Sequence, residues 1–273
     1  MLHELAMVIV EGLSEMCEWN IRDYYEKEAL ALKNHQKLMY FENPWSNYWH
    51  GERLRRIFEI LKQIEFRSFL DAGCAEGYYM KILEKNPFFG LPLIVGLDIA
   101  KNYLIKAKQN LSHSLLVEGD AAKLPFKENS FDLVLCTEVL EHVVNPEEAF
   151  NELLRVSRKY LLLTVAGENL FYYIAKKLGL IKNVNENPFA KFGHGHLHEM
   201  RMKNIICWSC KAGCKLLKKL VTCYFPASFL QRHKMPTFFI PIAKHIDRIL
   251  NKIPVIRELG AVQILLLKKS TEQ

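Results

Sequence analysis

The chain has 273 residues, of which 50% are hydrophobic and 25% charged, a composition typical of one large α/β domain or two small ones. An odd count of seven cysteines argues against a disulfide framework, and "MLHELAMVIVEGL" has neither the basic region of a signal peptide nor the length of a membrane span, so we expect a cytoplasmic protein. The formal net charge of +7 favours acidic partners such as phosphate-bearing substrates, nucleic acid or an anionic membrane surface, but requires none of them.

The first 65 residues are predicted to form helices. In "LRRIFEILKQI", residues 54–64, the apolar residues recur at the spacing of a buried helical stripe. We expect residues 1–65 to form a helical lid over a substrate pocket, and ordinary helix packing is an equal alternative. The aromatic residues that would form the lid are Tyr24, Tyr25, Trp45, Tyr48 and Trp49.

From residue 66 onward, short apolar runs alternate with amphipathic segments. The predicted strands are "FRSFLDAG", "LIVGLDIA", "SLLVEGDA", "FDLVLCTE", "YLLLTVA" and, near the end, "KLLKKLVTCYF" and "AVQILLLKK". Strands that alternate with helices indicate an α/β, doubly wound sheet, in which ligands bind at the carboxyl ends of the strands. Residues 66–273 would form this domain, with a substrate-region insert at about 168–259.

The stretch "FLDAGCAEGYYM" is predicted to be a strand-to-helix loop that holds a nucleoside. Ala75 and Tyr78 stand where a dinucleotide fingerprint needs glycine, and no Gly-Lys-Ser/Thr of a phosphate loop follows. What remains is Asp71 with Gly73 and Gly77. Such a loop suits a nucleoside with a tail that is not a phosphate, so an NAD-linked dehydrogenase is not expected.

Two further acids follow the next two strands. Asp98 ends the second strand and could accept hydrogen bonds from both ribose hydroxyls. Asp120, with the amide of Ala121 nearby, could bind adenine. Each acid alone could equally be a helix cap, because aspartate is a preferred capping residue. Together with the loop, and in order on successive strands, they predict a nucleoside site.

The successive motifs "FLDAGCAEG", "VGLDIA", "VEGDAAKLPF" and "FDLVLCTEVLEHV" resemble those of class I S-adenosylmethionine-dependent methyltransferases, particularly the broad small-molecule group. The resemblance covers roughly residues 66–165. It implies a Rossmann-like methyltransferase fold with a seven-stranded, mostly parallel sheet whose last strand is antiparallel. It also implies S-adenosyl-L-methionine as cofactor and methyl transfer to an O, N or C nucleophile of a small-molecule or lipid-like acceptor.

By this resemblance, ten residues would bind the cofactor. They are Asp71, Gly73, Cys74, Ala75, Gly77, Asp98, Ile99, Asp120, Ala121 and Glu138. Ala75 departs from the family, which usually has glycine there. We expect only a local adjustment of the loop, because alanine tolerates most conformations with negative φ. A positive φ would weaken binding.

Methyl transfer from a sulfonium needs mainly proximity and alignment, with a general base for some acceptors. Glu138 and His142 in "TEVLEHV" are the catalytic candidates. For His142 the favoured alternative is a helix-start residue that bonds to backbone. Loop histidines His194, His196 and His198 are further base candidates.

Metal chemistry is an alternative at the same motif. Glu138, Glu141 and His142, with His196 as a fourth ligand, are similar to the set of metal-dependent small-RNA 2′-O-methyltransferases. We favour a site without metal, since metal-free relatives share the string. RNA is therefore a less favoured partner, DNA is not expected, and a catalytically silent nucleoside- or partner-binding protein is the third interpretation.

Two C-terminal patterns leave alternatives open. Cys207, Cys210 and Cys214 could be metal ligands, but we favour small apolar residues on the buried face of a helix. "IPIAKHIDRILNKI", residues 240–253, predicts an amphipathic helix. Its expected apolar side consists of Ile242, Ile246, Ile249 and Leu250, and Lys244, Arg248 and Lys252 lie off that side. We favour packing on the protein's own sheet, and peripheral membrane contact or a lipid pocket is the alternative.

Overall fold

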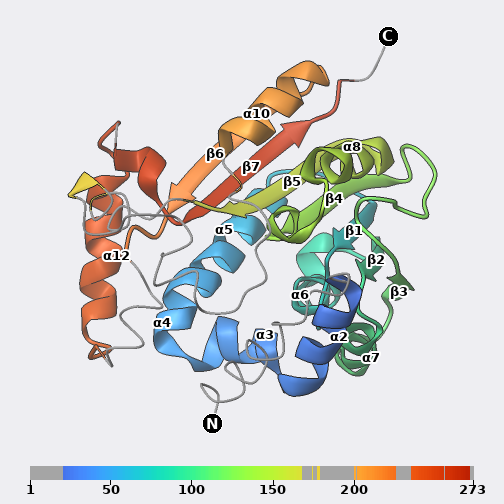
Figure 1. Ribbon diagram of the computed structural model, residues 1–273, viewed down its shortest axis with the longest axis horizontal. Coiled ribbons are helices and arrows are strands. Elements are labelled where there is room, and N and C mark those ends of the chain that lie inside the picture. The colour runs from blue at the N-terminus through green and yellow to red at the C-terminus, as the bar shows by residue number, and fades with distance from the viewer. Residues whose placement is uncertain are drawn as a thin grey trace, which may run out of the picture.

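The computed structural model of the protein describes residues 21–167, 200, 202–225, 235–254 and 256–270, together with 174, 177 and 178. Seven strands form one sheet in the order β3-β2-β1-β4-β5-β7-β6 (Figure 1). They are β1 (Ser68–Ala72), β2 (Leu93–Asp98), β3 (Leu115–Glu118), β4 (Phe131–Thr137), β5 (Ser157–Ala166), β6 (Lys215–Thr222) and β7 (Val262–Lys268). The predicted fold class is confirmed: β7 runs antiparallel to β5 and β6, and the other pairs are parallel.

Helices cover both faces of the sheet. They are α2 (Ile21–Ala31), α3 (His35–Lys37), α4 (Pro44–Ser46), α5 (Glu52–Leu61), α6 (Tyr78–Lys85), α7 (Lys101–Asn110), α8 (Pro146–Val156), α10 (Met202–Lys211) and α12 (Phe239–Leu250). Single turns of 3₁₀- or π-helix are η2 (Leu38–Glu42), η3 (Asn47–Gly51), η4 (Pro87–Phe89), η5 (Leu140–His142) and η7 (Ile256–Leu259). None of the helices that the structure describes is long and apolar enough to cross a bilayer.

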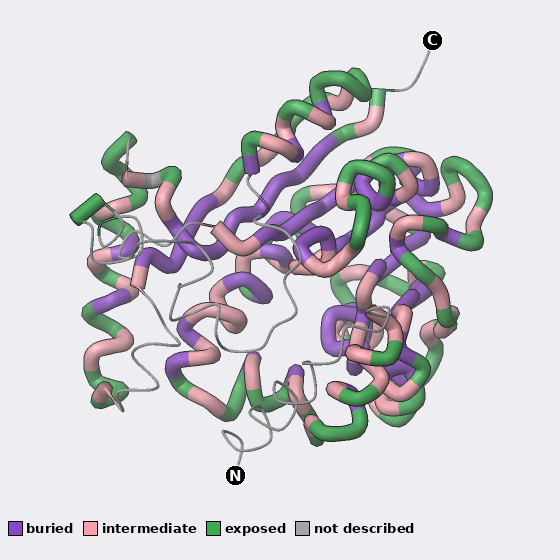
Figure 2. Tube along the Cα trace, in the orientation of Figure 1, coloured by how far each residue is buried: buried purple, intermediate pink, exposed green. Residues whose placement is uncertain are grey.

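The central strands are apolar on both sides because helices pack against both faces. Along β4, Leu133 and Leu135 point into a cluster with α5 and α6, whereas Val134 and Cys136 point into a second cluster with α8 and α10. This alternation follows the two-residue period of a strand. The buried residues therefore form two layers with the sheet between them (Figure 2).

The described part of the N-terminal region joins the first of these clusters. Trp45 and Tyr48 are buried within it, and Trp45 donates its indole N–H to the carbonyl of Met235 at 2.8 Å. These two aromatic residues therefore pack in the core, and the lid over a substrate pocket stays a prediction. The helix α2 lies farther along, beside α7 (Figure 1).

The favoured interpretation of the cysteines was wrong. Cys207 and Cys210 are exposed and Cys214 is half-buried, whereas α10 faces the sheet with Met202, Ile205 and Ser209. A helix turns by about 100° per residue, so Cys207 points away from the face that contains Ile205. Among the described residues, no group of three potential ligands could hold a metal.

Candidate functional site

The loop after β1 is shaped by three left-handed residues. Gly73, Ala75 and Gly77 have φ values of 83°, 45° and 75°. A Cβ on Gly73 would lie 2.2 Å from Cγ2 of Val139, so only glycine fits there. The expectation that Ala75 keeps a negative φ was wrong. Its amide donates to Oδ2 of Asp98 at 2.8 Å. This contact is made in the left-handed backbone conformation, which costs an alanine about 1–2 kcal/mol.

Asp71, at the end of β1, is fully buried. Neither of its carboxylate oxygens has a hydrogen-bond partner in the described structure. Burial, helped by the nearby charge of Asp98, raises the pKa of Asp71 to about 8. A buried carboxylate without partners is costly unless a cation or a donor is supplied to it. The end of β1 therefore suits a positively charged ligand.

The strand-end acids Asp98 and Asp120 both act as backbone caps. Asp98 accepts hydrogen bonds from the amides of Ala75 and, at 2.9 Å, of Ala100 at the start of α7. Burial raises its pKa to about 6, although these amides act in the opposite direction. Asp120 is exposed and accepts from the amide of Ala122 at 2.8 Å. Two carboxylates thus hold the backbone at the ends of β2 and β3.

The other predicted cofactor residues lie along the same edge of the sheet. Cys74 and Ala121 are buried, and Ile99 is half-buried. The amides of Gly73 and Cys74 both donate to the carbonyl of Leu97, at 2.7 and 3.0 Å. These bonds hold the loop of β1 against the end of β2, so the structure brings the predicted set together.

Glu138 follows β4 and is also left-handed, with φ of 52°. Its side chain forms an ion pair with Arg53 of α5. Arg53 is buried and donates at 3.3 Å to the hydroxyls of Tyr79 and Tyr40. The sequence analysis did not identify Arg53, because α5 was interpreted from its apolar stripe. The only signal was an arginine next to that stripe.

Glu141 and His142 form the turn η5 after β4. Glu141 is buried and accepts from the amide of Ala166 at 2.8 Å, while its Oε2 has no hydrogen-bond partner among the described residues. Burial and the charge of Glu138 raise its pKa to about 8. The ring of His142 meets Tyr25 of α2 edge to face, with 5.7 Å between ring centroids. The histidines at 194, 196 and 198 lie outside the described residues.

Residues 26–36 fasten the N-terminal helices to this edge of the sheet. Glu76, within the loop, accepts from the amides of His35 and Gln36 at 2.9 and 3.0 Å. The side chain of Gln36 accepts from the amide of Tyr78 at 3.2 Å. Glu26 caps α7 by accepting from the first two amides of that helix. These polar contacts join segments that are far apart in the sequence, so no local sequence pattern predicts them.

Comparison with known proteins shows which family has this arrangement of loop and strand-end acids. The methyltransferase domain family matches residues 70–161. The chain is 30% identical over 176 residues to an uncharacterised protein of Methanocaldococcus jannaschii, covering 63% of this chain and 68% of that protein. It is 28% identical over 174 residues to malonyl-[acyl-carrier protein] O-methyltransferase of Buchnera aphidicola, with 61% and 69% covered. The chain belongs to the class I S-adenosylmethionine-dependent methyltransferases.

The fold of this methyltransferase is shared with solved structures. Magnesium protoporphyrin IX methyltransferase of Synechocystis with bound S-adenosylhomocysteine superposes with a TM-score of 0.60, at 16% identity, over 92% of this chain and 98% of that one. The predicted enzyme class and the predicted cofactor, S-adenosylmethionine, are confirmed. The residues present fit this cofactor, because Asp71 offers unpartnered carboxylate oxygens for a cationic ligand and the loop is too tight at Gly73 for any side chain.

Proposed function

We propose that this methyltransferase methylates an O, N or C nucleophile of a small-molecule or lipid-like acceptor. The observation that carries the proposal is the attachment of α2 and α3 across the cofactor loop by Glu26, Gln36 and Glu76. Helices held there would limit access to the carboxyl ends of the strands, which suits a compact acceptor group. The Buchnera relative is named a malonyl-[acyl-carrier protein] O-methyltransferase, which is consistent with an acyl acceptor, in that case one carried by a protein.

The cofactor residues take the roles that the resemblance implies. Asp71 and the loop from Gly73 to Gly77 would line the methionine end. Asp98 would accept from the ribose hydroxyls while it keeps its bonds to the amides of Ala75 and Ala100. Asp120 and Ala121 would contact the adenine, and Cys74, Ile99 and Glu138 would complete the wall.

Bound S-adenosylmethionine supplies a methyl group on a positively charged sulfur. The acceptor's lone pair forms the new bond in line with the breaking carbon–sulfur bond, whose electrons stay on sulfur. The protein therefore aligns the acceptor and, where the nucleophile carries a proton, removes it. His142 at η5 is the proposed base. Glu138, held by Arg53, is the proposed positioning group on the acceptor side.

We also propose roles for the two parts of the chain that flank the cofactor site. Residues 1–65 act as the lid, and the segment at about 168–259 selects the acceptor. In the described structure Glu138 pairs with Arg53 and one oxygen of Glu141 binds the amide of Ala166. No three potential ligands among the described residues are grouped to hold a metal, so the metal-assisted RNA reaction stays the less favoured alternative. The cytoplasmic location stays a prediction.

The cofactor assignment is tested by titration calorimetry with S-adenosylhomocysteine. Asp98→Asn removes the charge that would face the ribose, and a hydrogen bond to a charged group is worth about 1.5–3 kcal/mol, so affinity should fall by roughly tenfold to a hundredfold. Asp132→Asn is the matched control. Asp132 is also a buried strand aspartate that accepts from a backbone amide, at 2.8 Å from Arg67, but it lies at the opposite end of the sheet.

The acceptor class is tested separately with a labelled methyl donor. Label should enter small-molecule or lipid fractions of a cell extract and not the RNA fraction. Label in RNA, lost on chelation of divalent cations, would overturn the proposal in favour of the metal-assisted reaction. Cofactor binding without transfer to any fraction would favour the silent binder.

A further inference from the structure

The helix α12 carries an exposed apolar row. Phe238, Ile242, Ile249 and Ile253 are 64%, 49%, 50% and 39% exposed. Ile242 and Ile249 lie on α12 itself, about 20° apart around its axis at roughly 100° per residue. Phe238 directly precedes the helix, and Ile253 follows its last residue by three positions. The predicted packing of α12 on the protein is present, but it uses another face than the one we expected. Isoleucines predicted to face the core line the surface instead.

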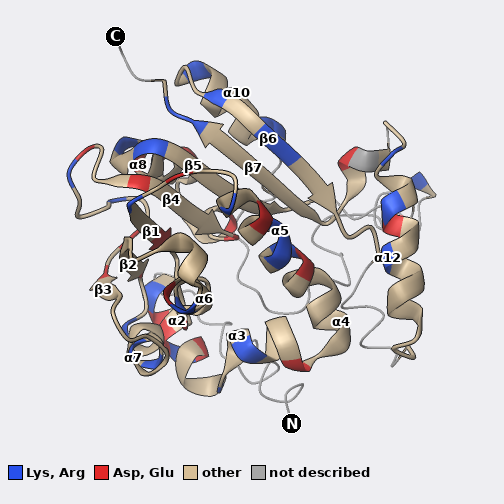
Figure 3. Ribbon diagram, turned by 180° about the vertical axis from the view of Figure 1, so that it is seen from behind, with Lys and Arg blue, Asp and Glu red and all other residues tan. Residues whose placement is uncertain are grey.

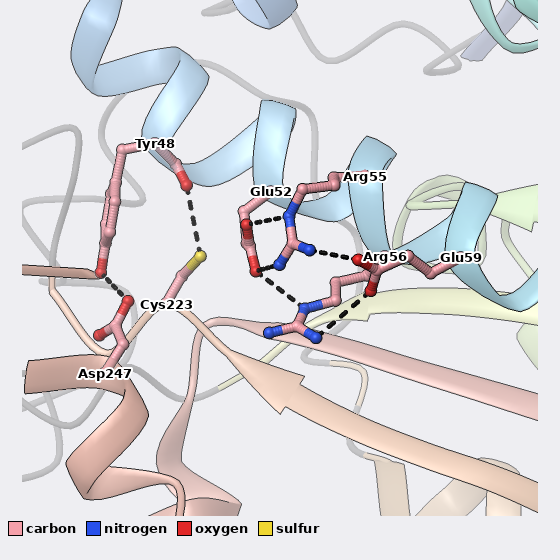
Figure 4. A network of polar contacts seen from close by, with 7 residues as sticks. All are labelled: Tyr48, Glu52, Arg55, Arg56, Glu59, Cys223 and Asp247. Carbon is pink, nitrogen blue, oxygen red and sulfur yellow. Dashed lines mark hydrogen bonds and ion pairs between the residues drawn. The ribbon is translucent and has the colours of Figure 1, made fainter. Parts of the chain in front are cut away.

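The face of α12 that packs inward is fixed by polar contacts. Ala243 and Asp247 are its buried residues. Asp247 accepts from the hydroxyl of Tyr48 at 2.6 Å (Figure 4) and from the amide of Tyr224 at 3.1 Å. These bonds set the rotation of the helix about its axis, so the apolar row cannot turn inward to become buried.

A basic row runs beside the apolar row. Lys244, Arg248 and Lys252 follow one another at four-residue spacing, and Arg248 and Lys252 are exposed. Among the described residues, these three cations form no salt bridge. The helix lies at the edge of the molecule, far from β3 at the other end of the sheet (Figures 1 and 3). The exposed surface of α12, called the ridge below, is therefore apolar along one line and cationic along the next.

We propose that α12 docks on the surface of an anionic phospholipid bilayer. A helix that lies in the interface buries apolar side chains among the acyl chains and places Lys and Arg among negatively charged headgroups. The two rows on α12 match these two layers. A second copy of the chain fits the surface less well, because pairing the apolar rows would bring the basic rows of two chains of net charge +7 together. The inference goes beyond the proposed reaction and does not rest on it.

The test is flotation of the protein with lipid vesicles, without cofactor or acceptor. The vesicles contain either phosphatidylcholine alone or a mixture with phosphatidylglycerol. We expect binding to the anionic vesicles that weakens with salt, and little binding to phosphatidylcholine. Ile242→Asn/Ile249→Asn should weaken binding at least about tenfold, because two inserted side chains are lost. Arg248→Glu/Lys252→Glu should do the same, because each cation contributes severalfold to the affinity for an anionic surface.

The matched control is Ile105→Asn/Lys108→Glu on α7, which changes an isoleucine that is 51% exposed and an exposed lysine on another helix. It should bind vesicles like the wild type. All substituted side chains are exposed, and circular dichroism verifies that each variant is folded. No binding of the wild type to anionic vesicles would overturn the proposal, as would equal losses in the control. A dimer that the isoleucine variant abolishes, without vesicle binding, would assign the ridge to a second copy.

Discussion

The ends of β1 and β4 lie side by side in the sheet, but the carboxylates at these two ends have opposite surroundings. At the end of β1, Asp71 is buried with both oxygens unpartnered in the described structure. At the end of β4, Glu138 is neutralised by the buried guanidinium of Arg53. A lone buried carboxylate selects a cation, whereas a paired one keeps its position and offers little net charge. This difference supports the proposed roles, in which Asp71 faces the cofactor and Glu138 helps to position the acceptor.

The largest effect is expected from breaking the pair at β4. Arg53→Met leaves Glu138 beside Glu141 without its cation. Removing one partner of a fully buried pair costs about 3–5 kcal/mol, but the side chain of Glu138 is 20% exposed, so we expect the lower end of that range, about 3 kcal/mol. The free energy of unfolding, measured by denaturant titration, should fall by this amount. Arg53→Met/Glu138→Gln should recover part of it, because the orphaned charge is also removed.

Arg55→Met is the control on the same helix. Arg55 forms ion pairs with Glu52 and Glu59 at the surface, and exposed pairs contribute about 0–1 kcal/mol. Equal losses for Arg53→Met and Arg55→Met would mean that the guanidinium of Arg53 does not balance buried charge.

At the end of β1, removing the carboxylate is expected to stabilise the folded protein, in contrast to the loss expected at β4. Above about pH 8, where Asp71 is ionised, Asp71→Asn removes an unpaired buried charge, so the melting temperature of the unliganded protein should rise there. Affinity for S-adenosylmethionine should fall about tenfold to a hundredfold, because a hydrogen bond to a charged group worth about 1.5–3 kcal/mol is lost. Calorimetry measures the affinity, with Asp132→Asn as control. Unchanged affinity would separate Asp71 from the cofactor and leave its burial unexplained.

The same carboxylates make cofactor binding depend on pH. Burial raises the pKa of Asp71 and of Glu141 to about 8, above the ~4 of the unfolded chain. Between about pH 4 and 8 the folded protein then holds more protons, so the free energy of unfolding falls as pH rises through this window. A bound cation favours the ionised carboxylate, so affinity for S-adenosylmethionine should rise towards pH 8.

Each carboxylate that must lose its proton on binding changes the affinity for S-adenosylmethionine by at most about tenfold per pH unit. Binding should release protons, which calorimetry in buffers of different ionisation enthalpy detects. Asp71→Asn should flatten the profile, whereas Asp132→Asn should leave it unchanged. A profile that is equally flat in the wild type would show that neither raised pKa is linked to the cofactor.

Periodicity in the sequence was sufficient to predict the sheet. Each of the seven strands was predicted within a few residues, because parallel strands buried on both faces form short apolar runs between helical segments. The edge of the sheet that would bind the cofactor was predicted from the acidic residues at the ends of successive strands. The sequence did not predict Arg53, Gln36 or Glu76, because their partners lie elsewhere in the chain and each stands in a helical or loop segment of ordinary composition.

The errors concern which face of a helix points inward. On α10 the cysteines and on α12 two isoleucines were expected in the core, yet Cys207 and Ile249 are exposed. Hydrophobicity identifies an amphipathic helix, but contacts such as that of Asp247 with Tyr48 decide its rotation. A polar residue in the buried position carries that information only once its partner is known.

The smallest effect is expected at Ala75, where the loop at β1 has a left-handed residue other than glycine. Ala75→Gly relieves a conformation that costs an alanine about 1–2 kcal/mol, while the added freedom of the unfolded chain offsets about 0.5–1 kcal/mol. The free energy of unfolding should rise by about 0.5–1 kcal/mol. Ala107→Gly, in the interior of α7, relieves nothing and should lower it, because glycine is less favourable than alanine inside a helix by about 1 kcal/mol. If both substitutions lower it by similar amounts, the backbone at Ala75 is unstrained. In that case alanine meets the requirements of the cofactor loop as well as glycine would.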